Sequence, residues 1–306
     1  MKALVISGGG SKGAFAGGVA EYLIKVKQKK YDIFVGSSVG SILISHLALN
    51  KIELLKYIFT HVSNKDIYNI MPFRIIHKKG QSTTKINHLN TIKAFLKGSS
   101  TFGESKNLRQ LIQRFYTPSD FEQLKKSSKI FFTVSNITQQ KVEYFYANQS
   151  NYDDFCDMMW ASANLVPFMS LLTKNGNQYA DGGFGAHIPV MQAISQGATE
   201  IDVIILDKEI KDDKIKISKN PFETLMGIFK FMANQSSLKD ILLGKLQGIQ
   251  SKIDIKLWFA PEKLTENALN FNTKQMTGWW QQGFEYARKE NPVCHCFLPN
   301  GKVHSF

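Results

Sequence analysis

The chain has 306 residues, of which 43% are hydrophobic and 12% aromatic, and its formal net charge is +13. This composition excludes a largely disordered chain, because the apolar residues suffice for a sizeable core. Three cysteines, Cys156, Cys294 and Cys296, are too few and too clustered for a disulfide framework and predict a reducing compartment.

The sequence predicts neither export nor insertion into a membrane. The apolar run before the first glycines is too short for a signal peptide, and no segment is predicted to span a membrane. We therefore expect a cytoplasmic protein. The lysine excess is explained either by a solvated surface or by attraction to an anionic one. No nucleic-acid-binding motif is present, so peripheral contact with anionic membrane stays open and nucleic acid is not expected. The oligomeric state is not indicated.

Strands and helices alternate in the first part of the chain. The pattern predicts a strand at Ala3–Ser7, a helix at Ala14–Lys27, a strand at Tyr31–Val35 and one long helix at Ser41–Phe59. Glycines follow both strands. This order is typical of a parallel α/β sheet with right-handed crossovers.

The rest of the chain is less regular. Residues 60–118 are predicted to form helices and loops over one face of the sheet. The later predicted elements are a hairpin of Ile130–Val134 with Val142–Tyr146, a helix at Asp153–Ser162, and strands at Tyr179–Ala180, Val203–Leu206 and Ile255–Phe259.

A long amphipathic helix is predicted at Pro221–Ile249. We expect it to pack against the sheet. An interfacial membrane role is the less favoured alternative.

A glycine-rich loop, Gly8-Gly9-Gly10-Ser11-Lys12-Gly13, separates the first strand from the first helix. Such a loop leaves amide groups uncovered at a helix start, where they can hold a phosphate or an oxyanion. It also satisfies G-x-G-x-x-G, so an NAD(P)-type dinucleotide site is an alternative. That site needs an acidic residue at the end of the second strand, whereas Asp32 lies at its beginning.

Two further motifs follow predicted strands. Gly36-Ser37-Ser38-Val39-Gly40 is a G-x-S-x-G sequence at a strand-to-helix junction, the setting of a nucleophile elbow, with Gly36 and Gly40 permitting the tight turn. Asp181-Gly182-Gly183 follows a short strand, although a D-G turn alone is common. Because functional groups gather at the carboxyl ends of parallel strands, we expect the three motifs to meet. They would supply oxyanion donors, a nucleophile and a base for acyl transfer.

The ordered set resembles the patatin-like phospholipases, whose pattern is G-G-G-x-[RK]-G, G-x-S-x-G and D-G-[GA]. The stretch Trp160-Ala161-Ser162-Ala163-Asn164-Leu165-Val166-Pro167-Phe168 is similar to the family's A-S-x-A-x-P-x-x-F. The resemblance spans residues 1–207. It implies a three-layer α/β/α sandwich with a mostly parallel central sheet. We expect a catalytic domain at residues 1–210 and a helical and strand extension at 211–306, packed on the same domain.

The resemblance also implies the chemistry. It implies a serine hydrolase that cleaves carboxylic esters of phospholipids or related lipids through a Ser–Asp dyad, without histidine or cofactor. The residues implied are Ser38 and Asp181 for the dyad, with Gly8, Gly9, Gly10 and Ser11 for the oxyanion hole. Lys12, with Gly13, would contact a substrate phosphate or anchor the loop. A non-catalytic lipid-binding module and a dinucleotide-binding protein remain as alternatives.

One departure from the family pattern concerns the dyad. The family's Asn-x-Pro is His187-Ile188-Pro189 here, so a Ser–His–Asp triad is the alternative to the dyad. A carboxylate base predicts activity well below the ordinary histidine pKa of about 6.5.

A metal site is considered and not expected. Cys294-His295-Cys296 has the residue types of metal ligands, but its spacing is tighter than usual and no second pair is evident.

Overall fold

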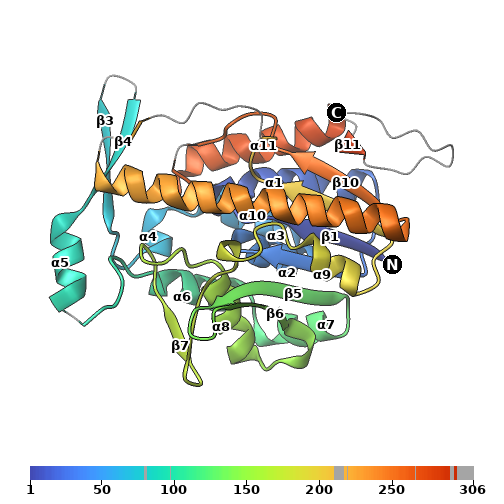
Figure 1. Cartoon of the computed structure of the whole chain (residues 1–306), viewed down its shortest axis with the longest axis horizontal. Helices are drawn as coiled ribbons and strands as arrows, with labels where there is room; N and C mark the ends of the chain where they lie inside the picture. The colour runs from blue at the N-terminus through green and yellow to red at the C-terminus, as the bar shows by residue number, and fades with distance from the viewer. Residues whose placement is uncertain are drawn as a thin grey trace.

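Nine strands of the described residues form one mixed, mostly parallel sheet (Figure 1). The computed structural model describes residues 1–78, 81–96, 98–209, 217–218, 220–265, 267–289 and 293–294. The sheet order is β11-β10-β9-β1-β2-β5-β8-β7, and β6 also pairs with β5. The strands are β1 Lys2–Ile6, β2 Ile33–Ser37, β5 Lys129–Asn136, β6 Lys141–Tyr146, β7 Leu172–Lys174, β8 Asn177–Asp181, β9 Glu200–Ile205, β10 Asp254–Phe259 and β11 Val293–Cys294.

The parallel part of the sheet is buried on both faces. Strands β10, β9, β1, β2 and β5 run parallel to their neighbours in that order. In β1, Leu4 and Ile6 belong to the core on one face, whereas Ala3 and Val5 belong to the core on the other. This double burial explains the continuous apolar runs of these strands. The predicted α/β class with a mostly parallel sheet is confirmed.

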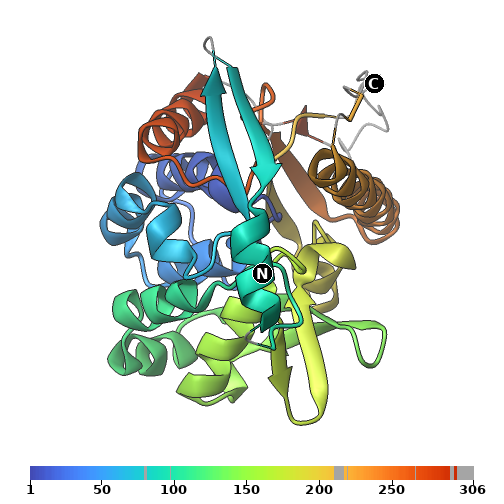
Figure 2. The ribbon, with the colours of Figure 1, turned by 90° about the vertical axis from the view of Figure 1, so that its left-hand side faces the viewer.

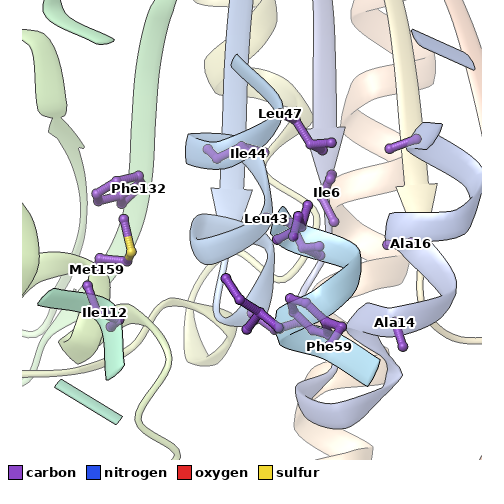
Figure 3. Packing of buried hydrophobic residues seen from close by; sticks show 14 of the residues in the cluster. Ile6, Ala14, Ala16, Leu43, Ile44, Leu47, Phe59, Ile112, Phe132 and Met159 are labelled. Atoms are coloured by element: carbon purple, nitrogen blue, oxygen red, sulfur yellow. The ribbon is translucent and has the colours of Figure 1, made fainter. Parts of the chain in front are cut away.

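Helices cover both faces of the sheet (Figure 2). The larger core includes side chains of α1 Gly13–Glu21, α2 Val39–Ala48, α3 Ile52–His61, α8 Tyr152–Ser162 and α11 Thr273–Lys289. Figure 3 shows part of it, with Ile6 of β1, Leu43 of α2 and Phe59 of α3 close together. The smaller core includes side chains of α9 Val190–Ser195 and α10 Pro221–Ser251.

Shorter elements complete the fold. The remaining helices are α4 Asn64–Ile67, α5 His88–Leu96, α6 Lys106–Phe115 and α7 Pro118–Lys125, with a π-helical turn at Tyr22–Val26 and 3₁₀ turns at Gly10–Lys12, Ala147–Gln149 and Gly182–Phe184. A separate hairpin joins β3 Phe73–Lys78 to β4 Gln81–Ile86.

The helix predicted at Ser41–Phe59 is two helices, so that prediction was wrong. Helix α2 ends at Ala48 and α3 begins at Ile52. Between them Asn50 has a positive φ of 55°, a left-handed conformation that asparagine tolerates better than most residues. The apolar pattern continues across this break because both helices face the same core.

The β3–β4 hairpin was also missed. Residues 60–118 were predicted to form only helices and loops, yet Phe73–Lys78 and Gln81–Ile86 pair antiparallel. The available signal was the β-branched content of the two segments, for example Ile75 and Ile76 opposite Thr84 and Thr83. The hairpin and α5 extend from one end of the molecule (Figures 1 and 2).

The prediction that the amphipathic helix at Pro221–Ile249 packs in the core is right for one side of the helix only. Leu225, Met226 and Phe229 of α10 pack against the larger core, and Ile241 packs against the smaller one. The opposite side exposes eight large apolar residues at 43% to 58% of their surface: Ile228, Phe231, Met232, Leu238, Leu242, Leu243, Leu246 and Ile249.

In the part of the chain that the structure describes, no helix combines the length and the apolarity needed to cross a bilayer. The His, Cys, Asp and Glu side chains of the described residues also form no cluster that could hold a metal ion. Of the Cys294-His295-Cys296 sequence, His295 and Cys296 lie outside the described residues.

Helices α1 and α11 pack with almost no space between them. The Trp280 side chain is buried, and its indole Nε1 donates a 2.6 Å hydrogen bond to Glu21 Oε2. A Cβ atom on Gly18 of α1 would overlap the Trp280 carbonyl oxygen. A Cβ on Gly278, on the exposed side of α11, would meet no atom within 4 Å.

These two glycines predict opposite effects of the same substitution. Gly18→Ala should lower the free energy of unfolding by about 2 kcal/mol or more, because the helices must separate to admit a methyl group. Gly278→Ala should leave it unchanged or raise it by up to about 1 kcal/mol, through better helix propensity. Urea denaturation of both variants measures the difference, and equal stabilities would contradict the described packing.

Candidate active site

Strands β2 and β8 meet tip to tip along one edge of β5. Ser37, the last residue of β2, pairs with Thr133, and Asp181, the last residue of β8, pairs with Val134. Because β6 occupies the other edge of β5, β2 and β8 share the same edge. Strand β8 is antiparallel to β5, so it approaches Ser38 from beyond the end of β2. The motifs meet as expected, although Asp181 ends an antiparallel strand instead of a parallel one.

Ser38 lies in a sharp turn between β2 and α2. It has φ 54° and ψ −127°, a conformation that costs energy for a residue with a side chain. A Cβ on Gly40 would overlap the Ile6 carbonyl oxygen, and one on Gly36 would lie 2.5 Å from the Gly40 carbonyl carbon. Both flanking glycines are therefore required by close backbone approach, as the elbow motif predicts.

Ser162 of α8 supports this turn. Its Oγ accepts a 3.1 Å hydrogen bond from the Ser38 amide and donates a 2.7 Å bond to the Thr133 carbonyl. It also lies 2.7 Å from Ser41 Oγ, on the first turn of α2. The Ser162 hydroxyl thus joins the strand, the turn and α8 around the serine.

The Ser38 hydroxyl donates a 2.6 Å hydrogen bond directly to Asp181 Oδ2. The other carboxylate oxygen, Oδ1, accepts a 2.7 Å bond from the Gly183 amide. Ser38 is 8% exposed and Asp181 5% exposed. Burial raises the pKa of Asp181 to about 6, because the two hydrogen bonds compensate only part of the lost hydration. The carboxylate is thus a stronger base than an exposed aspartate and is still mostly ionised at neutral pH.

His187 lies beside the site but is not bonded to the serine. A Cβ on Gly8 would lie 2.8 Å from His187 Cε1 and 3.3 Å from Ser38 Cβ, so the imidazole and the serine border the same glycine. The Nε2 atom is buried and has no hydrogen-bond partner among the described residues. Burial lowers the pKa of His187 to about 4, with Asp207 opposing the shift and Lys12 adding to it. The imidazole is therefore neutral at physiological pH.

The glycine-rich loop offers fewer free amides than expected. The Gly8 amide donates to the His187 carbonyl at 3.2 Å, and the Ser11 amide donates to the Ala268 carbonyl at 2.8 Å. Within the described chain, no backbone acceptor is recorded for the Gly9 and Gly10 amides. Gly10 has φ 56°, and a side chain there would overlap the Ala268 carbonyl oxygen.

Lys12 is held inside the protein. Its ammonium lies 2.6 Å from Asp207 Oδ1, and its side chain is only 9% exposed. Burial opposes ionisation of Asp207, but the charge of Lys12 and its hydrogen bond hold the pKa of this carboxyl below its usual value. The ion pair ties the loop after β1 to the segment after β9.

An apolar cavity begins at Ser38 and Gly10. It extends between α2, α3, α6 and α8, and its walls are almost entirely aliphatic and aromatic. Side chains that line it include Ile42, Phe59, Leu108, Ile112, Met159 and Phe271. Figure 3 shows Ile112 and Met159 side by side. The described residues therefore place a hydroxyl and a carboxylate at the start of an apolar cavity.

Comparison with known proteins agrees with this arrangement. Residues 4–194 match the family described as patatin-like phospholipase. The chain belongs to this family. Members of the patatin-like family are generally ester hydrolases. The matched residues include the last three residues of β1, the glycine loop, Ser38 and Asp181.

Individual similar proteins are more distant. The chain is 25% identical over 205 residues to the uncharacterized protein YjjU of Escherichia coli (strain K12), a match covering 66% of this chain and 51% of that protein. The chain thus spans about half the length of this curated relative. A crystal structure of VipD from Legionella pneumophila aligns with a TM-score of 0.48 and 12% identity, covering 94% of this chain and 66% of VipD.

The sequence predicted the patatin-like motifs but not the residues that hold these motifs in place. Ser162 was quoted only as part of the family's A-S-x-A stretch, with no role. Asp207 was not singled out as a functional residue. The cavity wall was not foreseen, because its residues come from five separate helices and resemble ordinary core residues.

The hydrogen bonds of Ser162 predict a stability effect. Ser162→Ala should lower the free energy of unfolding by about 1–3 kcal/mol, because the buried Ser38 amide loses its acceptor. Ser195→Ala, at an exposed hydroxyl of α9, should change it by less than about 0.5 kcal/mol. Chemical denaturation of the two variants tests this, and equal stability would remove Ser162 from the support of the turn.

Proposed function

We propose that the protein is a serine acyl hydrolase that cleaves carboxylic esters of phospholipids or related lipids. The observation that carries the proposal is the buried 2.6 Å hydrogen bond from Ser38 Oγ to Asp181 Oδ2, at the start of an apolar cavity. A nucleophile bonded to its base is the arrangement needed for covalent acyl transfer.

The first step is attack by Ser38. The Asp181 carboxylate accepts the hydroxyl proton as Ser38 Oγ bonds to the ester carbonyl carbon. The carbonyl oxygen gains negative charge, and the amides of Gly9 and Gly10 are the donors we assign to it, because those of Gly8 and Ser11 are engaged. Helix α2 begins at Val39, so its positive end faces the same charge.

The second step releases both products. Protonated Asp181 returns its proton to the leaving alcohol as the carbonyl–oxygen bond breaks, which leaves an acyl group on Ser38. A water molecule, deprotonated by Asp181, then cleaves this ester and restores the free hydroxyl. In this scheme Lys12 anchors the oxyanion loop through Asp207 and does not contact the substrate.

The cavity supports an acyl chain as the part of the substrate that enters first. Side chains such as Ile42, Leu108 and Phe271 offer a hydrocarbon surface and few polar atoms. Burying methylene groups there supplies binding energy that a short, polar ester lacks. This favours esters of long-chain acids over small water-soluble ones.

The dinucleotide alternative is disfavoured by the same loop. A pyrophosphate at the start of a helix needs free amides, whereas the Ser11 amide is bonded to Ala268 and that carbonyl oxygen covers Gly10. Asp32 accepts a bond from the Lys2 amide at the opposite end of the strands. The non-catalytic alternative is disfavoured by the direct bond between Ser38 and Asp181.

Substitutions separate a dyad from a triad. Ser38→Ala should abolish ester hydrolysis and labelling by a fluorophosphonate probe. Asp181→Asn should reduce kcat/KM by about a thousandfold, because the amide cannot take the proton. His187→Asn should retain most of the activity. The activity of each variant is measured with a p-nitrophenyl ester, and near-UV circular dichroism checks that the variant is folded. If folded His187→Asn loses as much activity as folded Asp181→Asn, the Ser–His–Asp triad replaces the dyad.

The pH profile provides an independent test and corrects the simpler expectation from sequence. Activity should be lost as pH falls through about 6, because protonation of Asp181 removes the base. A carboxylate with its ordinary pKa would remain active at lower pH, as would a base with the pKa of about 4 found for His187. The measurement is kcat/KM for an uncharged ester, with folding checked at each pH. Undiminished activity at pH values well below 6 would contradict Asp181 as a base with this pKa.

A further inference from the structure

The outer side of α10 presents a row of apolar side chains to solvent, with one gap between Met232 and Leu238. We call it the outer stripe: Ile228, Phe231, Met232, Leu238, Leu242, Leu243, Leu246 and Ile249. Most members follow one another at steps of three or four residues, so they line one side of the helix. The helix has 31 residues and runs across the molecule (Figure 1). At 1.5 Å per residue, it is about 46 Å long.

Such a row differs from the scattered apolar residues of ordinary surfaces. Single exposed leucines are common, whereas a contiguous apolar patch marks an interaction site. The inner side of α10 packs against the two cores through four side chains, Leu225, Met226, Phe229 and Ile241. The outer stripe therefore contributes nothing to the described core and exposes large side chains at an unfavourable free energy.

The charges on the helix point to an anionic partner. Lys230, Lys239 and Lys252 are exposed on or at the end of α10. Of its acids, Asp240 is buried and accepts a hydrogen bond from the Ile188 amide at 2.9 Å, and Glu223 is half-buried. Among its described side chains, the exposed charges of α10 are thus all positive, on a protein of net charge +13. Apolar residues flanked by lysines are typical of helices that lie in the interface of anionic bilayers.

The inner side of α10 is attached to the segment that follows Asp181. Ser236 Oγ accepts a 3.2 Å bond from the His187 amide. The Phe229 ring lies 5.6 Å from Phe184 and 5.9 Å from Phe168, between centroids. The inner side of α10 is therefore fixed to residues next to the candidate site, whereas the outer stripe lies on the other side of the helix.

We propose that the outer stripe of α10 is the surface by which this protein docks on an anionic lipid bilayer, with the helix lying in the plane of the interface. The need for a bilayer rests on the proposed function, since a lipid hydrolase must reach its substrate there. A second copy of this chain fits the stripe less well, because each copy would bring the same exposed lysines to the contact.

The test compares two triple variants in vesicle flotation. The first, Phe231→Gln with Leu242→Gln and Leu246→Gln, removes side chains that are 57%, 58% and 55% exposed. The matched control, Val26→Gln with Tyr57→Gln and Ile137→Gln, removes side chains that are 53%, 52% and 43% exposed on other elements. Glutamine is a good helix former, so α10 should persist, which circular dichroism checks.

Vesicles of phosphatidylcholine are used with and without phosphatidylglycerol. The parent protein should bind the anionic vesicles more tightly, and salt should weaken that binding. The stripe variant should bind at least about tenfold more weakly, and the control within about twofold of the parent. Equal binding by the stripe variant and the parent, or equal losses in both variants, would overturn the proposal.

Two further readouts separate the remaining outcomes. Turnover of p-nitrophenyl butyrate, which needs no interface, should be unchanged in both triple variants. If neither the parent nor the variants hydrolyse this ester or a long-chain p-nitrophenyl ester, while the stripe still governs vesicle binding, the proposed function fails and the docking surface stands. Light scattering reports the second-copy alternative: a dimer that the stripe variant dissociates, with vesicle binding unaltered, would assign the stripe to self-association instead.

Discussion

The arrangement of the candidate site depends on one buried hydrogen bond, between the Ser38 hydroxyl and the Asp181 carboxylate. A carboxylate removed from water is costly unless its oxygens are bonded, and here the Ser38 hydroxyl and the Gly183 amide serve both oxygens. The two hydrogen bonds compensate only part of the lost hydration, and the raised pKa of Asp181 reflects the part that is not compensated. The same incomplete solvation that destabilises the charged form makes this aspartate a better proton acceptor. In the proposed reaction, burial of the Asp181 carboxylate therefore both lowers the stability of its charged form and strengthens it as a base.

The sheet makes this bond possible by letting two strands end against each other on one edge of β5. Neither Ser38 nor Asp181 needs a long, mobile loop to reach its partner, because consecutive β5 residues, Thr133 and Val134, set their spacing. Ser162 then locks the turn from the α8 side. An arrangement built on strand ends and one helix is more rigid than one built on loops, which suits a site that must hold a nucleophile within hydrogen-bond distance of its base.

Much of this arrangement was predictable from sequence, and the failures have physical reasons. Glycine and aspartate motifs are local, so the strand-to-helix turn at Ser38 and the meeting with Asp181 followed from residue types and order. The direction of β8 did not, because it depends on how β8 pairs with β7 and β5, which the local D-G-G motif does not reveal. The break at Asn50 was hidden by an apolar pattern shared by two helices. The pKa of Asp181 depends on burial by side chains distant in sequence, and the exposed side of α10 has the same composition as a core helix.

The central position of β1 has a consequence for synthesis of the chain. Its two neighbours are β2, close in sequence, and β9, whose Glu200 pairs with Lys2. Both faces of β1 are buried only when these partners and their helices are in place. At translation rates of about 5–20 residues per second, β9 emerges about 10–40 s after β1. During that interval one edge of β1 keeps its backbone N–H and C=O groups unpaired, and the apolar faces of the strand are not fully covered, so the nascent chain is exposed to intermolecular strand pairing until β9 is made.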